Sequence, residues 1–238
     1  MTATFYRLLP VLGFSLLTAC SSLQEEQVDE VAPRQLNKQD PSYVNPFSPT
    51  SYAHFVASKD YPKTYGTYID KTLLNLPGKH QKKIHICLKE QRGRLYIDHQ
   101  VAIDFPTSTG VSAFPTKAGN YTVIAKEVDH TSNLYGRMYD ADGKCIDSNA
   151  NATDPVPEGG KFVGSPMPYW QRLTGAGLGL HVGNVRRRPV SHGCIRLQPS
   201  TAKILYKETS LGTPVFIHQD VEKEALDYKE TITKNTKK

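Results

Sequence analysis

Short apolar runs separated by turn residues fill the middle of this chain, and they constrain its fold more than any other feature. Residues 83–88 alternate apolar with other side chains, residues 91–94 turn, and residues 95–98 continue the pattern, which is typical of a β-hairpin. Two further β runs lie at 101–105 and 121–125, and turn residues stand near them: Pro106, Gly110, Pro115 and Gly119. The pattern predicts a mainly β domain.

Helices are few in this pattern. Residues 199–207 begin with a proline and are followed by Gly212, which predicts one short helix, and residues 214–217 predict the strand after it. Residues 144–163 are rich in Asp, Asn, Pro and Gly and predict a long loop. A loop of that length is unusual in a compact domain unless it is a lid or a binding element.

Length and composition indicate one globular domain with tails. The chain has 238 residues, of which 38% are hydrophobic and 22% charged, and this excludes collagen, a coiled coil and wholesale disorder. Its 29 basic and 23 acidic residues give a net charge of +6. The basic residues are spread along the chain, and the one tight cluster is 186–188, so nucleic acid is not an expected partner. An anionic cell-envelope polymer fits the modest positive charge better.

Residues 1–19 predict a signal peptide. Their only charge is Arg7, which precedes an apolar run at 8–17. The run contains a proline and a glycine and is too short to span a bilayer of about 30 Å as a helix.

The six residues 17–22, Leu-Thr-Ala-Cys-Ser-Ser, resemble the bacterial lipobox. In that motif small residues precede a cysteine that is acylated and becomes the new N-terminus, so the resemblance implies lipidation of Cys20 and stable attachment to a membrane leaflet. The alternative is a secreted protein in which Cys20 is incidental. Ser21 resembles the sorting pattern of Gram-negative outer-membrane lipoproteins, which implies a periplasmic location with a lipid anchor in the outer membrane.

The rest of the chain divides into three parts. Residues 20–65 are polar and without periodicity and predict a flexible tether, residues 66–220 carry the β pattern, and residues 221–238 predict a charged tail. Aromatic residues in the tether leave open that its second half packs on the domain: Tyr43, Phe47, Tyr52 and Phe55.

Two histidines and one cysteine lie within residues 175–197. A cysteine nucleophile needs a neighbour that favours its thiolate, since a free thiol has a pKa near ~8.5. Either His181 or His192 could be that neighbour of Cys194. Gly193 permits close approach of the backbone to a ligand, so that N–H groups beside Cys194 could face a developing oxyanion.

Three other interpretations fit single features of this segment. The first is a buried, unreactive cysteine with structural histidines. The second is a zinc site made by His181, His192 and Cys194, although the segment has neither a CxxC or HxxxH pair nor a clear fourth ligand. The third is a dinucleotide-binding loop at 175–179, but its glycines do not continue into the G-x-G-x-x-G spacing and predict a bend into a strand.

Residues 191–197, Ser-His-Gly-Cys-Ile-Arg-Leu, resemble the signature of the L,D-transpeptidases with a YkuD-like catalytic domain. His181 upstream and Gly-Thr-Pro-Val at 212–215 match the family as well. Two further segments are similar to family segments: 114–121 and 167–170.

The resemblance covers roughly residues 81–218 and implies that residues 66–220 are the catalytic domain, a mainly β, YkuD-like sandwich or barrel with a few short helices. It implies acyl transfer on peptidoglycan stem peptides through a thioester, with release of a terminal D-amino acid. A second stem peptide, a free D-amino acid, a lysine of an envelope protein or water then takes the acyl group, and the sequence does not choose among them. The alternatives are a hydrolytic L,D-carboxypeptidase or endopeptidase with the same site, and a peptidoglycan-binding lipoprotein without turnover.

The resemblance also implies a role for each matching residue, and it implies neither a cofactor nor a metal. The catalytic residues would be Cys194 as nucleophile, His181 as general base and Val182, whose backbone carbonyl would orient His181. The oxyanion hole would consist of the backbone N–H groups of His192, Gly193 and Cys194. The substrate-binding residues would be Ser191, Arg196, Tyr169 and Trp170.

Two more cysteines lie outside the signature. An oxidising compartment permits a disulfide between Cys87 and Cys145, although their spacing in the sequence does not show that they are close.

Overall fold

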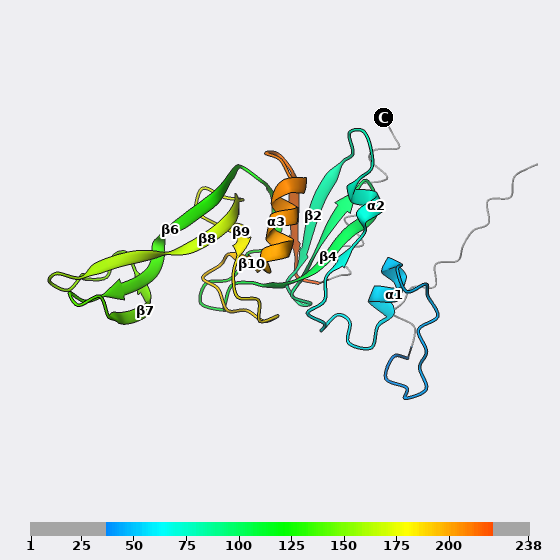
Figure 1. The fold of residues 1–238 in the computed structure, drawn as a ribbon, viewed down its shortest axis with the longest axis horizontal. Helices are drawn as coiled ribbons and strands as arrows, with labels where there is room; N and C mark the ends of the chain where they lie inside the picture. The colour runs from blue at the N-terminus through cyan, green and yellow to red at the C-terminus, as the bar shows by residue number, and fades with distance from the viewer. Residues whose placement is uncertain (1–36, 221–238) are drawn as a thin grey trace, which may run out of the picture. The chain divides into compact units, whose positions relative to one another are not determined.

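The computed structural model describes residues 37–220, and these form a mainly β fold with three short helices, which confirms the predicted fold class. The helices are α1 (Tyr52–Ala57), α2 (Lys71–Leu74) and α3 (Pro199–Glu208). The strands are β1 (Tyr68–Ile69), β2 (Lys82–Cys87), β3 (Arg92–Ile97), β4 (Gln100–Ser108), β5 (Gly119–Thr122), β6 (Ala125–Tyr139), β7 (Cys145–Asn151), β8 (Lys161–Arg172), β9 (Gly179–Val182), β10 (Ile195–Leu197) and β11 (Pro214–His218) (Figure 1). Within the described residues no helix is both long enough and apolar enough to cross a membrane.

The strands are joined in the order β5-β11-β2-β3-β4-β10-β9-β8-β6-β7, and β1 pairs with β4 beside that path. β4 connects the two halves, because most of its length pairs with β3 while Thr107 and Ser108 at its end pair with β10. The pairs β11–β2 and β10–β9 are parallel. The parallel β9–β10 pair carries His181 and the segment that follows Cys194.

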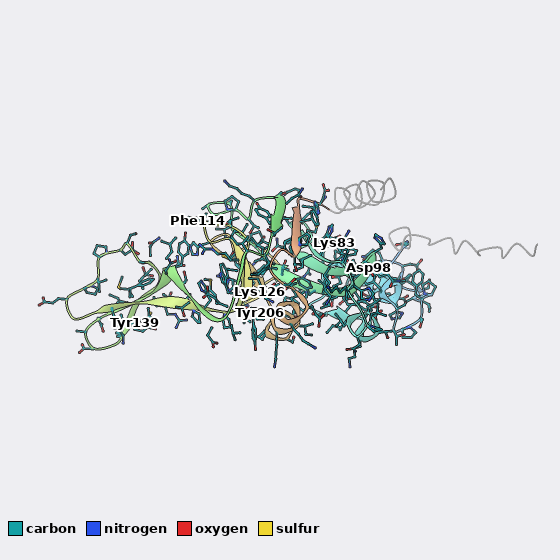
Figure 2. All side chains as sticks on the ribbon, turned by 90° about the horizontal axis from the view of Figure 1, so that it is seen from above. Lys83, Asp98, Phe114, Lys126, Tyr139 and Tyr206 are labelled. Atoms are coloured by element: carbon teal, nitrogen blue, oxygen red, sulfur yellow. The ribbon has the colours of Figure 1, made fainter. Side chains whose placement is uncertain are left out.

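One hydrophobic core joins both halves of the sheet to α3. Its buried members come from β2, β3, β4, β9, β10, β11 and α3, and include Ile84, Ile86, Leu95, Ile103, Leu180, Ile195, Leu197 and Leu205. At the end of α3, the ammonium group of Lys126 on β6 donates to the carbonyl oxygens of Tyr206 and Thr209 and lies 4.2 Å from the centre of the Tyr206 ring (Figure 2). A cation is favourable there because the last carbonyls of a helix have no partners within the helix.

β6, β7 and β8 form a three-stranded arm that runs away from α3 in Figure 1. The predicted loop at 144–163 is therefore wrong, because its first part is β7 and its last residues begin β8. Most residues of β7 are exposed, and only Ala150 is buried. β7 is stabilised by backbone hydrogen bonds to β6. The sequence pattern predicts a strand only where alternate side chains are buried, so it misses β7.

Residues 37–65 pack on the domain, which corrects the predicted tether boundary at residue 65. The hydroxyls of Tyr52 and Tyr61 donate to Oδ2 of Asp104 in β4, at 2.8 and 3.1 Å. The packing of the second half of the tether, which the aromatic residues leave open in the sequence, is thus observed. The predicted signal peptide at 1–19, the lipidated Cys20, the tether up to residue 36 and the tail at 221–238 lie outside the described residues.

The buried guanidinium of Arg92 also binds the end of the 37–65 segment. Arg92 in β3 is fully buried and donates to the carbonyl oxygens of Thr64 and Gly66, at 2.9 and 3.1 Å. Its Nε donates to Oδ1 of Asp104 at 2.6 Å, so one ion pair between β3 and β4 anchors the N-terminal segment to the sheet.

Asp104→Asn is expected to lower the free energy of unfolding by about 3–5 kcal/mol. The substitution removes the negative charge from a fully buried pair and leaves the Arg92 guanidinium without its counter-charge. Urea unfolding followed by circular dichroism measures the change. Asp98→Asn, which removes the acidic partner of the partly exposed His80, is the control and should cost much less. An equal loss in the two variants would contradict this account of the buried pair.

The structure does not contain the disulfide that the sequence permits. Cys87 is buried in β2, Cys145 is exposed at the start of β7, and the two are not bonded. Six strands lie between β2 and β7 in the sheet order, whereas a disulfide needs Cα atoms within about 7 Å.

Candidate active site

Cys194 lies at the end of a tight turn, immediately before β10. Ser191 Oγ donates to the carbonyl oxygen of Cys194 at 2.5 Å and accepts from the N–H of Gly193 at 3.2 Å. Thr116 Oγ1 donates to the carbonyl oxygen of Gly193 at 2.5 Å and accepts from the N–H of Gly110 at 2.8 Å. Gly193 has a φ of +113°, which favours glycine, so the turn requires the residue that the signature places there.

The N–H groups of this turn are not equivalent. That of Gly193 is used by Ser191 Oγ, whereas those of His192 and Cys194 have no acceptor within residues 37–220. A backbone N–H that has no partner in the protein can bind a developing oxyanion. The predicted oxyanion hole therefore has two available donors rather than three.

His181 on β9 lies beside this turn because β9 and β10 are parallel neighbours. Arg196 is the register partner of His181, and Ile195, the residue after Cys194, is the partner of Leu180. His181 Nδ1 lies 2.7 Å from the carbonyl oxygen of Val182, which is the contact that the family resemblance implies. A carbonyl can only accept, so Nδ1 carries the proton and Nε2 is left as the basic atom.

Burial keeps both groups neutral at rest. It lowers the pKa of His181 to about 4, although the Val182 carbonyl opposes the shift, and the charge of Arg196 lowers it further. Burial also raises the pKa of Cys194. A backbone hydrogen bond from Gly179 and the positive charge of Arg196 lower it in part. The thiol donates to the carbonyl oxygen of Gly177 at 3.3 Å. In this state the imidazole is able to accept a proton and the thiol is able to give one.

Cys194 lines two cavities. One, of about 290 Å³, contains His181 and Arg196, and we call it the His181 cavity. The other, of about 420 Å³, contains His130 of β6 and Trp170 of β8, and we call it the His130 cavity. Both share residues of the arm and of the Cys194 turn: Ser132, Tyr135, Met167 and His192. Cys194 is therefore accessible from two sides.

The two histidines of the signature differ in their surroundings. The ring of His192 stacks on Tyr135 of the arm, with 4.3 Å between ring centroids and 14° between planes, and it contacts Phe114 at 4.9 Å. These aromatic contacts hold the ring, and within the described residues its nitrogens have no hydrogen bond that would orient it as a base. The geometry favours His181 as the base.

A bulge in β6 brings Tyr135 to His192. Between the pairs Thr131–Pro166 and Gly136–Gly164, four residues of β6 lie opposite a single residue of β8. The hydroxyl of Ser132 accepts from the N–H groups of Leu134 and Tyr135 and closes the bulge. No local sequence signal marks this bulge, because it depends on the register between distant strands.

Arg196 is a half-buried cation in the His181 cavity. It makes no hydrogen bond or ion pair with any other residue in the described range 37–220. Burial lowers the pKa of Arg196, and the thiol of Cys194 opposes that shift. An unpaired guanidinium in a cavity favours an anionic ligand such as a carboxylate.

Three of the predicted substrate-binding residues are buried or packed against neighbouring side chains. Ser191 is 3% exposed and its hydroxyl is used within the turn. Tyr169 packs against Tyr206 of α3, 5.6 Å away, and lines neither cavity. Trp170 is 2% exposed and lies between two imidazoles, with His130 at 4.9 Å and His181 at 5.8 Å. Ser191 still lines the His181 cavity and Trp170 the His130 cavity, so their roles in substrate binding stay predictions, as does that of Arg196.

Metal binding finds no support in the part of the chain that the structure describes. Within residues 37–220, no three side chains of His, Cys, Asp or Glu are grouped so as to hold a metal ion.

Comparisons with known proteins agree with these features. The family model for the YkuD L,D-transpeptidase catalytic domain matches residues 81–217, more than half of the chain. A curated relative, the probable L,D-transpeptidase 3 of Mycobacterium tuberculosis, is 28% identical over 121 residues, and the match spans 48% of this chain and 38% of the relative.

Solved structures give similar matches. An L,D-transpeptidase from Mycobacterium smegmatis is 23% identical, with a TM-score of 0.45 over 58% of this chain and 59% of that one. L,D-transpeptidase 3 from Mycobacterium tuberculosis is 21% identical, with a TM-score of 0.45 over 58% of this chain and 61% of that one. On the strength of the family model, the chain belongs to the family of YkuD L,D-transpeptidase catalytic domains.

Proposed function

We propose that this chain is a peptidoglycan L,D-transpeptidase that acts through a thioester on Cys194. His181 Nε2 takes the thiol proton as sulfur attacks the carbonyl of the third stem residue. The tetrahedral oxyanion is bound by the N–H groups of His192 and Cys194. The proton on His181 then goes to the leaving D-amino acid, and an acceptor later releases the acyl group from sulfur.

One observation carries the proposal. The sulfur of Cys194, the imidazole of His181 on the neighbouring strand and two backbone N–H groups that have no acceptor within residues 37–220 lie at the junction of two cavities. These are the nucleophile, the base and the oxyanion donors that acyl transfer needs. A purely structural cysteine needs none of them.

The charges of the cavities support an anionic substrate. Among the described residues no Asp or Glu side chain lines either cavity, whereas Arg196 lines the first and Lys117 and Arg172 line the second. Peptidoglycan stem peptides carry several carboxylates. In this proposal Arg196 binds one of them while the scissile carbonyl lies over Cys194.

The wider setting is also part of the proposal. The lipobox-like sequence supports a lipid anchor on Cys20 and a place on the periplasmic side of the outer membrane. The expected partners are stem peptides and not nucleic acid, and a lysine of an envelope protein is the alternative acceptor. Hydrolysis by the same site is the second candidate, because water can reach a thioester through either cavity.

Mass spectrometry of the products formed from disaccharide-tetrapeptide tests the proposal. Cross-linked dimers that lack one terminal D-alanine are the expected result with the purified protein. Tripeptide as the sole product would replace the transferase by the hydrolase. If the tetrapeptide remains intact while the protein still binds peptidoglycan, the non-catalytic alternative is correct.

A further inference from the structure

A second imidazole stands beside the nucleophile, outside the residues of the signature. His130 lies on β6, and its Nδ1 is 2.6 Å from Oε2 of Glu127 on the same strand. Its ring is stacked on Trp170, with 4.9 Å between centroids and 9° between planes. The carboxylate and the indole together fix both the position and the plane of this ring.

The geometry leaves one nitrogen of His130 available. The Glu127 carboxylate accepts a hydrogen bond from Nδ1–H of His130. In the neutral ring the other nitrogen, Nε2, therefore carries the lone pair. Nε2 has no partner among residues 37–220, and about a quarter of the side chain (24%) is exposed. His130 therefore presents a basic nitrogen to the cavity that it lines together with Cys194.

The two cavities thus have one oriented imidazole each. His181 lines only the His181 cavity, and His130 lines only the His130 cavity, while Cys194 lines both. Trp170 separates the two rings, since it contacts both. One imidazole can serve the thiol and the leaving group, and the other can serve a molecule that enters from the opposite side.

The remaining charges of the His130 cavity are positive. The Lys117 ammonium is exposed and has no hydrogen bond or ion pair with another described residue. The Arg172 guanidinium donates to the carbonyl oxygens of Thr174 and Gly175 and adds a second positive charge. No carboxylate from residues 37–220 lines this cavity, so its positive charges are available to a carboxylate of the ligand.

We propose that the His130 cavity is the acceptor site, that His130 is a second catalytic base, and that Lys117 selects acceptors whose amine and carboxylate lie on the same carbon. This inference rests on the proposed function and names the acceptor class that the function leaves open. A free D-amino acid and the amino-carboxylate end of a diamino acid side chain belong to the class. A protein lysine does not, because its ammonium has no carboxylate beside it.

In the proposed aminolysis of the thioester, both imidazoles transfer protons. The acceptor ammonium gives one proton to His130 Nε2, and the neutral amine attacks the thioester carbonyl. A C–N bond forms, the C–S bond breaks, and sulfur leaves with the electron pair. The second amine proton passes through His181 to the sulfur and restores the thiol, while the imidazolium of His130 releases its proton to water.

The test measures how the thioester is partitioned between two fates. The purified full chain is given a tetrapeptide donor with either D-methionine or 3-(methylthio)propylamine, the same amine without its carboxylate. The exchange product and the hydrolysed tripeptide come from one thioester, so their ratio reports the acceptor step independently of the rate of acylation. His130→Gln should lower the exchange-to-hydrolysis ratio with D-methionine by about 10-fold or more.

Lys117 and a matched control complete the design. Lys117→Gln should reduce the preference for D-methionine over the amine without a carboxylate, while Lys203→Gln, an exposed lysine on α3, should leave that preference unchanged. Glu127→Gln, which loosens His130 without removing it, should lower the ratio in the same direction. The inference is overturned if the ratio is unchanged in His130→Gln, or if the wild type accepts the two amines equally. If the wild type consumes no donor at all, both the proposed function and this inference are contradicted.

Discussion

Cys194→Ala is expected to abolish consumption of the tetrapeptide donor, with kcat/KM at least about 10⁴-fold lower than in the wild type. The substitution removes the sulfur at the junction of the two cavities and leaves no atom there that can form an acyl intermediate. The turn itself should remain, because its hydrogen bonds come from Ser191 and Thr116 and from the backbone, and the thiol contributes only one long contact to Gly177.

Donor consumption and the mass of the covalent adduct measure this effect, and a thermal melt followed by circular dichroism checks the fold. Cys145→Ala is the matched control, since Cys145 is exposed on β7 and lines neither cavity. It should retain full activity. Residual activity above about 1% in Cys194→Ala would mean that another group carries the acyl transfer.

The sequence predicts the strands that have a buried face and misses the one that has none. Residues 83–88, 95–98 and 214–217 fall on β2, β3 and β11, whose apolar side chains fill the core. β7 has a single buried residue and depends on backbone pairing with β6, which leaves no pattern in its own sequence. Alternation of apolar side chains in the sequence indicates a buried face. Most of the arm has no such face, so the sequence does not predict its strands.

In the site, too, the sequence predicts some features and misses others. The signature brings Cys194, Gly193 and His181 together as predicted, and the Val182 carbonyl meets His181. Tyr169 and Trp170, which the sequence predicts together as substrate-binding residues, have different neighbours in the fold. Neighbouring residues of a strand point to opposite faces, so Tyr169 meets α3 while Trp170 meets the two imidazoles.

His130 and Tyr135 carry no motif, and their positions depend on pairing between distant strands. His130 lies opposite Met167, and the bulge that follows turns Tyr135 toward His192. A register between segments almost 40 residues apart is set by the whole sheet, and no short window of sequence contains it. The positions of His130 and Tyr135 beside Cys194 are for that reason visible only in the fold.

His181→Gln should lower kcat/KM by about 10³-fold, whereas His192→Gln should cost less than about 10-fold. Glutamine at 181 can still donate to the Val182 carbonyl but cannot take the thiol proton. Glutamine at 192 loses the ring stack on Tyr135 and keeps the backbone N–H groups of the turn. Initial rates with the tetrapeptide donor measure both effects, and equal losses in the two variants would contradict the assignment of His181 as the base.

The pH profile distinguishes a base from a structural residue at the same position. Burial lowers the pKa of His181 to about 4, so its neutral, proton-accepting form persists down to that pH. The wild-type kcat/KM should therefore show its acid limb near pH 4, and a limb centred near the ordinary histidine value of 6.5 would point to another base. Stability changes over the same range, because the unfolded chain binds protons at its histidines as the pH falls from 6.5 to 4 while the folded His181 does not. Folding is thus progressively weakened in that window, and rates are compared per folded molecule, with circular dichroism at each pH supplying the folded fraction.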